Sequence, residues 1–216
     1  LAHFINVLDQ RIGRGNYLLF LTADHGGTHS YPRMTSHGLP SDCWHNPDAL
    51  TAANELLQQQ FGVEKLLKAE MEYTFYLDEE AIHAAHLDRA QVMRAACKAL
   101  EQPEQIQWAI DVANIDSYPI PTILKERIKL GYFPERSGEI YIVPRTGVYA
   151  GKAEWAGSNH GTWSQSDSHI PLIFMGWHIT PGETSRLTHM TDIAATVCAM
   201  LHIQAPNGCI GTPIFE

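Results

Sequence analysis

A long apolar run that ends abruptly in Asp24-His25-Gly26 restricts the fold of this chain more than any other feature of its sequence. Residues 17–23 are almost entirely apolar, which leaves no side for water, so we expect a buried parallel strand with helices over both faces. Such a strand delivers the residues after it to the sheet edge, where open α/β folds usually bind ligands. Asp24 offers an oxygen and His25 a nitrogen, a pairing that suits zinc and similar ions. A strand followed by an ordinary polar turn is the alternative, and the motif alone does not separate the two.

The spacing of apolar and turn residues divides the chain into three regions. The first contains a helix, the apolar strand and a loop rich in Gly, His, Ser and Pro. The last contains a strand at 170–176 and a helix with Thr191 at its N-cap and Asp192 in its first turn. The middle region alternates helices and strands, and the expected elements are a helix starting at Pro47, strands at 72–77, 106–112 and 139–143, and helices at 88–101 and 121–129.

At 216 residues, the chain fits one domain or one domain with a sizeable insertion. We therefore predict an α/β fold in which residues 1–45 and 151–216 form the main layer and residues 46–150 form a small inserted α+β cap. Residues 1–9 already follow a helical pattern, with no initiator Met and no signal-peptide region. We expect the chain to be part of a longer polypeptide, with any targeting signal upstream.

The net charge of the chain limits which classes of molecule it can bind. A net charge of −9 argues against a nucleic-acid polymer, because phosphate backbones need clustered Lys and Arg. A small phosphorylated substrate stays compatible with this charge, since bound metal ions reverse the local field. No apolar run approaches the roughly 20 residues that span a bilayer, so we expect no membrane span.

Four cysteines are present, and none forms a CxxC pair, which excludes a zinc ribbon and a thioredoxin-like motif. Cys97 lies in a helical pattern, and we expect it to be a small buried residue. Cys198 and Cys209 can form a disulfide in an oxidising compartment or stay free, and the sequence leaves both open.

A second metal ligand must come from elsewhere in the chain. His160 lies between small residues that would let an ion approach its ring, but it follows Asp24 by 136 positions, so only the fold can bring the two together. Three further histidines, His29, His37 and His45, either line a pocket or belong to a simple polar loop. No G-x-S-x-G, G-x-x-x-x-G-K-[ST], G-x-G-x-x-G or H-E-x-x-H motif is present, which argues against the hydrolases, nucleotide-binding folds and zincins that use them.

Four segments in order resemble the alkaline phosphatase superfamily. They are the Asp-His motif at 15–26, the Arg-Ser-Gly-Glu-Ile stretch at 136–140, the His-Gly motif at 160 with the strand after it, and the closing helix and tail at 191–213. The chain is most similar to bacterial periplasmic phosphatases related to the type I phosphodiesterases/nucleotide pyrophosphatases. The resemblance implies a central sheet flanked by helices with an inserted cap, in a catalytic domain of which residues 1–45 and 151–216 form the C-terminal part. It also implies a periplasmic or extracellular location and a small phosphorylated substrate.

The resemblance assigns metal ligands residue by residue. Asp24 and His25 match ligands of the zinc that activates the nucleophile, and His160 matches a ligand of the zinc at the leaving group. The nucleophilic Thr or Ser, the first Asp ligand and an Asp-x-x-x-His pair have no counterpart in this chain and would lie upstream of Leu1. The full-length enzyme would bind two zinc ions and form a phospho-enzyme, whereas these 216 residues carry three of six protein ligands. We therefore expect no zinc or partial occupancy here, and little or no activity.

Three other functions stay open at this point. A phosphodiesterase or nucleotide pyrophosphatase would use the same metal ligands, and a manganese-dependent phosphoglycerate mutase shares the Asp-His-Gly strand end. A degenerate domain that binds a protein partner would also explain an Asp-His pair without its other ligands. The natural substrate, the choice between monoesters and diesters, and the oligomeric state are not determined by this sequence.

Overall fold

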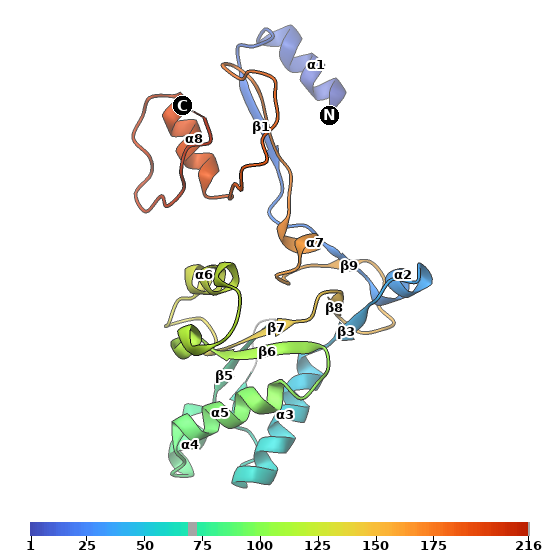
Figure 1. Cartoon of the computed structure of the whole chain (residues 1–216), viewed down its shortest axis with the longest axis vertical. Coiled ribbons are helices and arrows are strands. Elements are labelled where there is room, and N and C mark those ends of the chain that lie inside the picture. Colours follow the sequence, from blue (N-terminus) through green and yellow to red (C-terminus); the bar gives the residue numbers. More distant parts are fainter. Residues whose placement is uncertain (69–72, 216) are drawn as a thin grey trace. The chain divides into compact units, whose positions relative to one another are not determined.

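The computed structural model describes residues 1–68 and 73–215, which form two compact units. One unit combines Leu1–Asp24 with Ile170–Glu216, and the other is His25–His169. Most of their helices and strands are labelled in Figure 1. The described residues contain no helix that is long and apolar enough to cross a membrane.

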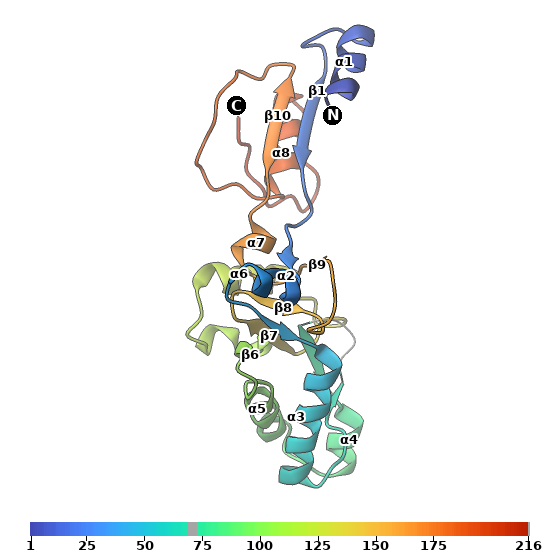
Figure 2. The same ribbon diagram turned by 90° about the vertical axis from the view of Figure 1, so that its right-hand side faces the viewer.

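The first unit is built on one antiparallel strand pair, in which Leu18 faces Gly176 and Thr22 faces Leu172. Figure 2 shows the two strands side by side. Two helices accompany them, and the elements of this unit are α1 (Ala2–Arg11), β1 (Leu18–Thr22), β10 (Leu172–Gly176) and α8 (Asp192–Met200).

The prediction of a parallel strand buried on both faces is wrong for β1. β1 runs antiparallel to β10, which is its one partner among the described residues. Phe20 and Leu21 remain 43% and 40% exposed, so this unit does not cover both faces of β1. Helix α1 has no buried residue and therefore supplies no such cover. An apolar run predicts that a strand is buried, but it does not predict which other segments pack on the strand.

Helix α8 begins where predicted, with Thr191 at the N-cap position. The Thr191 side chain, however, makes no capping hydrogen bond. Asp192 is buried rather than facing solvent, and its carboxylate accepts hydrogen bonds from the backbone N–H groups of His189 and Thr212 at 2.9 Å each. Asp192 therefore fastens the C-terminal tail to the start of α8.

The second unit contains a four-stranded antiparallel sheet in the order β4-β5-β7-β6. Its strands are β4 (Leu67–Lys68), β5 (Thr74–Leu77), β6 (Ile106–Asp111) and β7 (Ile140–Pro144), and its helices are α3 (Asn46–Phe61), α4 (Glu79–Ala84), α5 (Arg89–Leu100), the 3-10 helix η1 (Val112–Ser117) and α6 (Thr122–Gly131). Two shorter strand pairs lie in the same unit, parallel β3 (Asp42–Trp44) with β8 (Val148–Ala150), and antiparallel β2 (Thr28–His29) with β9 (Ser158–Asn159). Short helices α2 (Tyr31–Ser36) and α7 (Gln165–Ser168) complete it.

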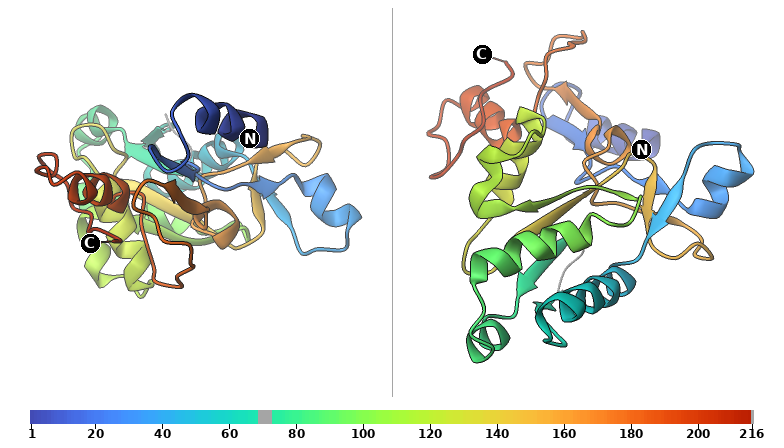
Figure 3. Two further views of the ribbon diagram at one scale, coloured as in Figure 1. Left: turned by 90° about the horizontal axis from the view of Figure 1, so that it is seen from above. Right: turned by 60° about the horizontal axis from the view of Figure 1, so that its bottom comes forward.

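Helices cover both faces of the four-stranded sheet (Figures 1 and 3). Helices α3 and α5 pack on one face, in a core that includes Phe75 and Ile142. Helix α6 and η1 pack on the other face, against Ile110 and Val143. The two faces alternate along β7, since Ile142 belongs to one core and Val143 to the other.

The predicted elements of the middle region are largely confirmed. The expected helices correspond to α3, α5 and α6, and the expected strands at 106–112 and 139–143 correspond to β6 and β7. The expected strand at 72–77 corresponds to β5 from Thr74 onward, and Glu72 lies outside the described residues. The division into a main layer and an inserted cap at 46–150 stays a prediction.

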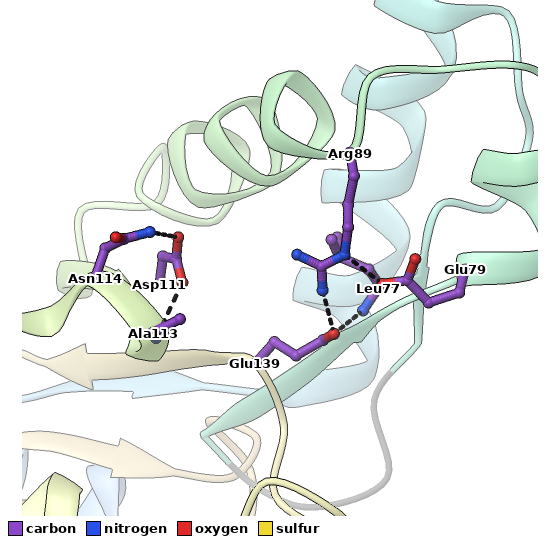
Figure 4. Close-up of polar contacts among 7 residues, drawn as sticks. All are labelled: Leu77, Glu79, Arg89, Asp111, Ala113, Asn114 and Glu139. Atoms are coloured by element: carbon purple, nitrogen blue, oxygen red, sulfur yellow. Dashed lines mark hydrogen bonds and ion pairs between the residues drawn. The ribbon is translucent and has the colours of Figure 1, made fainter.

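Glu139, in the Arg-Ser-Gly-Glu-Ile stretch, joins three elements of this unit (Figure 4). One carboxylate oxygen accepts a hydrogen bond from the Leu77 N–H at 2.8 Å, and the other contacts Arg89 Nη2 at 2.5 Å. Arg89 also donates through Nε to Glu79 at 2.7 Å. Figure 4 also shows Asp111, whose carboxylate caps η1 by accepting from the Ala113 N–H at 3.1 Å.

All four cysteines are free. Cys97 is buried on α5, as predicted, and burial raises the pKa of its thiol to about 12. A thiol with so high a pKa stays protonated at neutral pH and behaves as an apolar side chain.

Asp78 makes the stability of this unit dependent on pH. Its carboxylate caps α4 by accepting from the Ala81 N–H at 3.1 Å and lies 2.9 Å from Lys68 Nζ. The hydrogen bond from Lys68, and then that from Ala81, lowers the pKa of Asp78 below its ordinary value of 3.8. The resulting stabilisation is present above the unfolded-state pKa and is lost as the pH falls through the folded-state pKa.

We therefore expect Asp78→Asn to lower the melting temperature at pH 7 and to have little effect near pH 2. Thermal unfolding of both proteins at the two pH values measures this difference. Asp88→Asn is the control, because Asp88 caps α5 through the Gln91 N–H without a lysine in contact among the described residues. An equal penalty for Asp78→Asn at both pH values would contradict the ionic contribution.

Candidate functional site

The predicted ligands Asp24 and His25 are neighbours in sequence that belong to different units. Asp24 follows β1 at the end of the first unit, and His25 begins the second. Both side chains are exposed. His25 and the third predicted ligand, His160, belong to the same unit, so their mutual geometry is defined.

Pairing of β2 with β9 brings His25 and His160 together across 135 positions of sequence. Thr28 faces Asn159 and His29 faces Ser158 in this short ladder. His25 precedes β2 and His160 follows β9, so the two histidines meet at one end of the antiparallel pair. The two imidazole rings stack with their centroids 3.5 Å apart and their planes at 18°.

The tautomer of His25 follows from its hydrogen bond. His25 Nδ1 lies 2.7 Å from the carbonyl oxygen of Gly26. Because a carbonyl oxygen can only accept, Nδ1 carries a proton, and in the neutral ring the lone pair then lies on Nε2. A hydrogen bond of this kind usually orients a metal-binding histidine.

The donor types at this position fit zinc, but their number does not complete a site. The lone pair of an imidazole nitrogen lies in the ring plane, so two stacked rings can bind separate ions at their edges and cannot share one ion between their faces. Among residues 1–68 and 73–215, no group of three or more His, Cys, Asp or Glu side chains gathers closely enough to hold a metal. A structural or catalytic zinc takes about four donors. The residues present therefore fit as partial contributions to a metal centre.

Close backbone contact fixes the loop after His25. The Gly26 N–H donates to the Asp167 carbonyl at 2.8 Å, and the Gly27 N–H donates to the Ser166 carbonyl at 2.9 Å. A Cβ on Gly26 would lie 1.9 Å from the Ser166 carbonyl oxygen, a distance that no side chain tolerates. Gly26 thus allows close approach between segments 140 positions apart.

Tyr73 supports the His160 loop, and sequence reasoning did not single it out. Tyr73 is 5% exposed and has φ of 66°, a left-handed conformation that is strained for a residue with a side chain. Its hydroxyl donates to the His160 carbonyl oxygen at 3.5 Å. A Cβ added to Gly161 would lie only 2.8 Å from Cε2 of the Tyr73 ring, so the ring needs a glycine at this position. No periodic pattern in the sequence signals this contact, because it depends on φ and on a residue 88 positions later.

The other histidines of the first loop lie within or beside local helices and strands. His37 ends α2, and its Nδ1 donates to the Arg33 carbonyl at 2.9 Å. His45 precedes α3 and lies 2.9 Å from the Asp48 carboxylate. His29 is an exposed member of β2. These contacts favour the polar-loop interpretation for His37 and His45.

The sequence model described as "Type I phosphodiesterase / nucleotide pyrophosphatase" matches residues 1–167. A Myroides odoratus protein named "Calcium-transporting ATPase" is 40% identical over 100% of this chain and 39% of its own length. "Alkaline phosphatase PafA" of Elizabethkingia meningoseptica is 38% identical over 100% of this chain and 39% of its own length.

The crystal structure of wild-type PafA matches with a TM-score of 0.90 at 38% identity, over 99% of this chain and 40% of that one. The chain thus spans about two fifths of the length of these relatives.

Proposed function

Because this chain belongs to the type I phosphodiesterase/nucleotide pyrophosphatase family, we propose that it forms the C-terminal part of a zinc-dependent phosphatase that hydrolyses phosphate monoesters. The predicted α/β fold of the alkaline phosphatase type is confirmed by the likeness to PafA. In this proposal, a Thr or Ser upstream of residue 1 carries the phosphoryl group, and small phosphorylated molecules are the substrates. The complete protein is periplasmic or extracellular.

The stacking of His25 on His160 is the observation that supports this proposal best. Two-metal hydrolases place their ions about 3.5 to 4 Å apart. The stacked rings of His25 and His160 have their centroids 3.5 Å apart, which is the same range as the spacing of two such ions. His25 and Asp24 would contribute to one zinc and His160 to the other.

In the proposed reaction, residues of this chain bind the zinc ions and hold the binding histidines in place. When bound, the two zinc ions lower the pKa of a nucleophile and neutralise the departing oxygen. His25 keeps its proton on Nδ1 through the Gly26 carbonyl and so presents Nε2 as the ligand atom. The β2–β9 ladder and the close approach at Gly26 limit the movement of both histidines, which preorganises the centre.

The exposed apolar surface of the first unit is consistent with a larger catalytic domain. Phe20 and Leu21 on β1 and Ile173 on β10 are 43%, 40% and 52% exposed. Full burial of such a side chain is worth about 1.5 to 3 kcal/mol relative to full exposure, and these three, still roughly half exposed, would gain a part of that from a cover. We assign their cover to the rest of the catalytic domain, with residues 46–150 as its inserted cap.

A diesterase is the second candidate, and the description of the matching family favours it. The relative named as an alkaline phosphatase, PafA, favours monoesters instead. Parallel assays with an aryl phosphate monoester and an aryl phosphate diester separate the two.

We expect the purified 216-residue chain with added zinc to hydrolyse p-nitrophenyl phosphate no faster than the blank. The reason is that three of the six expected ligands and the nucleophile lie outside it. A polypeptide that covers the full length of the relatives should hydrolyse the ester. In that longer protein, His25→Ala or His160→Ala should lower kcat/KM by roughly 100-fold or more.

His3→Ala is the matched control, since His3 is exposed on α1. Zinc-dependent turnover by the isolated chain would overturn the proposed division of the active site. Unchanged kcat/KM in the His25→Ala and His160→Ala proteins would overturn the ligand roles. An inactive longer protein that captures a protein partner would favour the degenerate binding domain.

A further inference from the structure

Asp167 is a buried carboxylate with hydrogen-bond donors on both oxygens. It lies on α7 and is 4% exposed. Its Oδ1 accepts from Thr28 Oγ1 at 2.6 Å and from Ser166 Oγ at 3.3 Å. Its Oδ2 accepts from the Thr162 N–H at 2.9 Å and from Thr162 Oγ1 at 2.7 Å. A buried carboxylate needs such donors, because losing its water costs several kcal/mol.

The two oxygens serve different loops. Oδ1 binds Thr28, which lies on β2 three residues after His25. Oδ2 binds Thr162, which lies two residues after His160. The Asp167 backbone adds a third link, since its carbonyl accepts from the Gly26 N–H at 2.8 Å.

A row of hydroxyl groups also lies between the two loops. Thr28 Oγ1 lies 3.0 Å from Ser166 Oγ, which lies 2.8 Å from Ser164 Oγ, which lies 2.7 Å from Thr162 Oγ1. Thr28 and Ser164 are buried with Asp167. Each hydroxyl has one proton, and those of Thr28 and Thr162 go to the carboxylate, so the serine hydroxyls donate in only some of these contacts at a time. The carboxylate nevertheless lies in a packed polar cluster that contains residues of both loops.

We propose that Asp167 is a positioning residue that sets the spacing and stacking of His25 and His160. Its relevance to catalysis rests on the proposed function of those two histidines. Asp167 is not itself a ligand, because its four donors occupy the approximately four lone-pair positions of a carboxylate. It acts through Thr28 on one side and Thr162 on the other.

Asp167→Asn tests this inference with minimal change of shape. An amide has one accepting oxygen and one donating nitrogen, so in either orientation one loop loses its acceptor. Asp192→Asn is the matched control, because Asp192 is also 4% exposed and accepts two backbone hydrogen bonds, but in the other unit. Both variants should lose stability, and only Asp167→Asn should disturb the histidines.

The measurement is NMR of the 216-residue chain with isotope-labelled histidine, without metal. In the unmodified chain, each stacked ring shifts the ring protons of the other upfield. We expect Asp167→Asn to abolish this shift for His25 and His160, and Asp192→Asn to retain it. Retention of the shift in a folded Asp167→Asn chain would overturn the inference.

A second variant and a zinc titration test the positioning role independently of whether Asp167→Asn folds. If Asp167→Asn does not fold, Thr162→Val removes only one hydroxyl donor and should reduce the upfield shift, and an unchanged shift would again contradict the positioning role. Zinc titration by calorimetry, with zinc alone as the probe, should show roughly tenfold weaker binding in Asp167→Asn where the unmodified chain binds. A chain that binds no zinc is the expected result for an incomplete centre, and loss of stacking in that chain would by itself support the positioning role.

Discussion

Gly26→Ala is expected to destabilise the His25–His169 unit by roughly 3 kcal/mol or more, which corresponds to about 10 °C in melting temperature. The added Cβ would lie 1.9 Å from the Ser166 carbonyl oxygen, so the two backbones must separate. Separation also breaks the hydrogen bonds that Gly26 and Gly27 donate to Asp167 and Ser166. The clash involves backbone on both sides, so no side chain can rotate to relieve it.

Gly27→Ala is a close control for this substitution. It adds the same methyl group to the next residue, where the nearest atom would be 3.7 Å away, an ordinary contact. We expect a change below about 1 kcal/mol for Gly27→Ala. Differential scanning calorimetry measures stability, and the histidine NMR spectrum reports whether His25 still stacks on His160. Similar melting temperatures for the two variants would show that segments 26–27 and 166–167 can separate at no cost.

Phe75→Ala is expected to lower the free energy of unfolding of the same unit by about 3 to 5 kcal/mol. Phe75 is 0% exposed on β5 and belongs to the core between the sheet and helices α3 and α5. Its backbone pairs with Ile140 of β7, so the cavity would open at the centre of the sheet. Neighbouring strands cannot collapse into the space without breaking that pairing, and the cavity therefore stays open.

Phe133→Ala provides the matched control in the same unit. Phe133 is 49% exposed and its ring lies 5.0 Å from the Arg136 guanidinium carbon. Removing it should cost below about 1 kcal/mol, the scale of an exposed cation–π contact. Hydrogen exchange of the β6 and β7 amides follows this unit separately from the other. Equal protection factors in the two variants would contradict a core role for Phe75.

Local pattern predicted the elements of the middle region well. Helices α3 and α5 were recognisable because Pro47 marks a helix start and because apolar residues recur at helical spacing in 88–101. Strand β7 was recognisable from its β-branched residues, and in the structure it is buried between two cores. The short strands β2 and β9 carried no such signal, since two residues have no periodicity.

The surroundings of β1 could not be predicted in the same way. Its apolar run indicated a strand, and a strand is present. Its antiparallel partner and its exposed Phe20 and Leu21 depend on which other segments pack on it, which a local run does not specify. Thr191 shows the same limit, since its position was right but the hydrogen bonds are made by Asp192.

The sequence by itself determined the elements and the candidate chemistry, because helical spacing, strand composition and the Asp24-His25 pair are local properties. Only the tertiary structure decided that His160 lies against His25, because a two-residue ladder joins segments 130 positions apart. It also decided that Asp167 lies buried between their loops and that Gly26 must lack a side chain. These contacts depend on distances between remote backbones, and no short stretch of sequence encodes such distances.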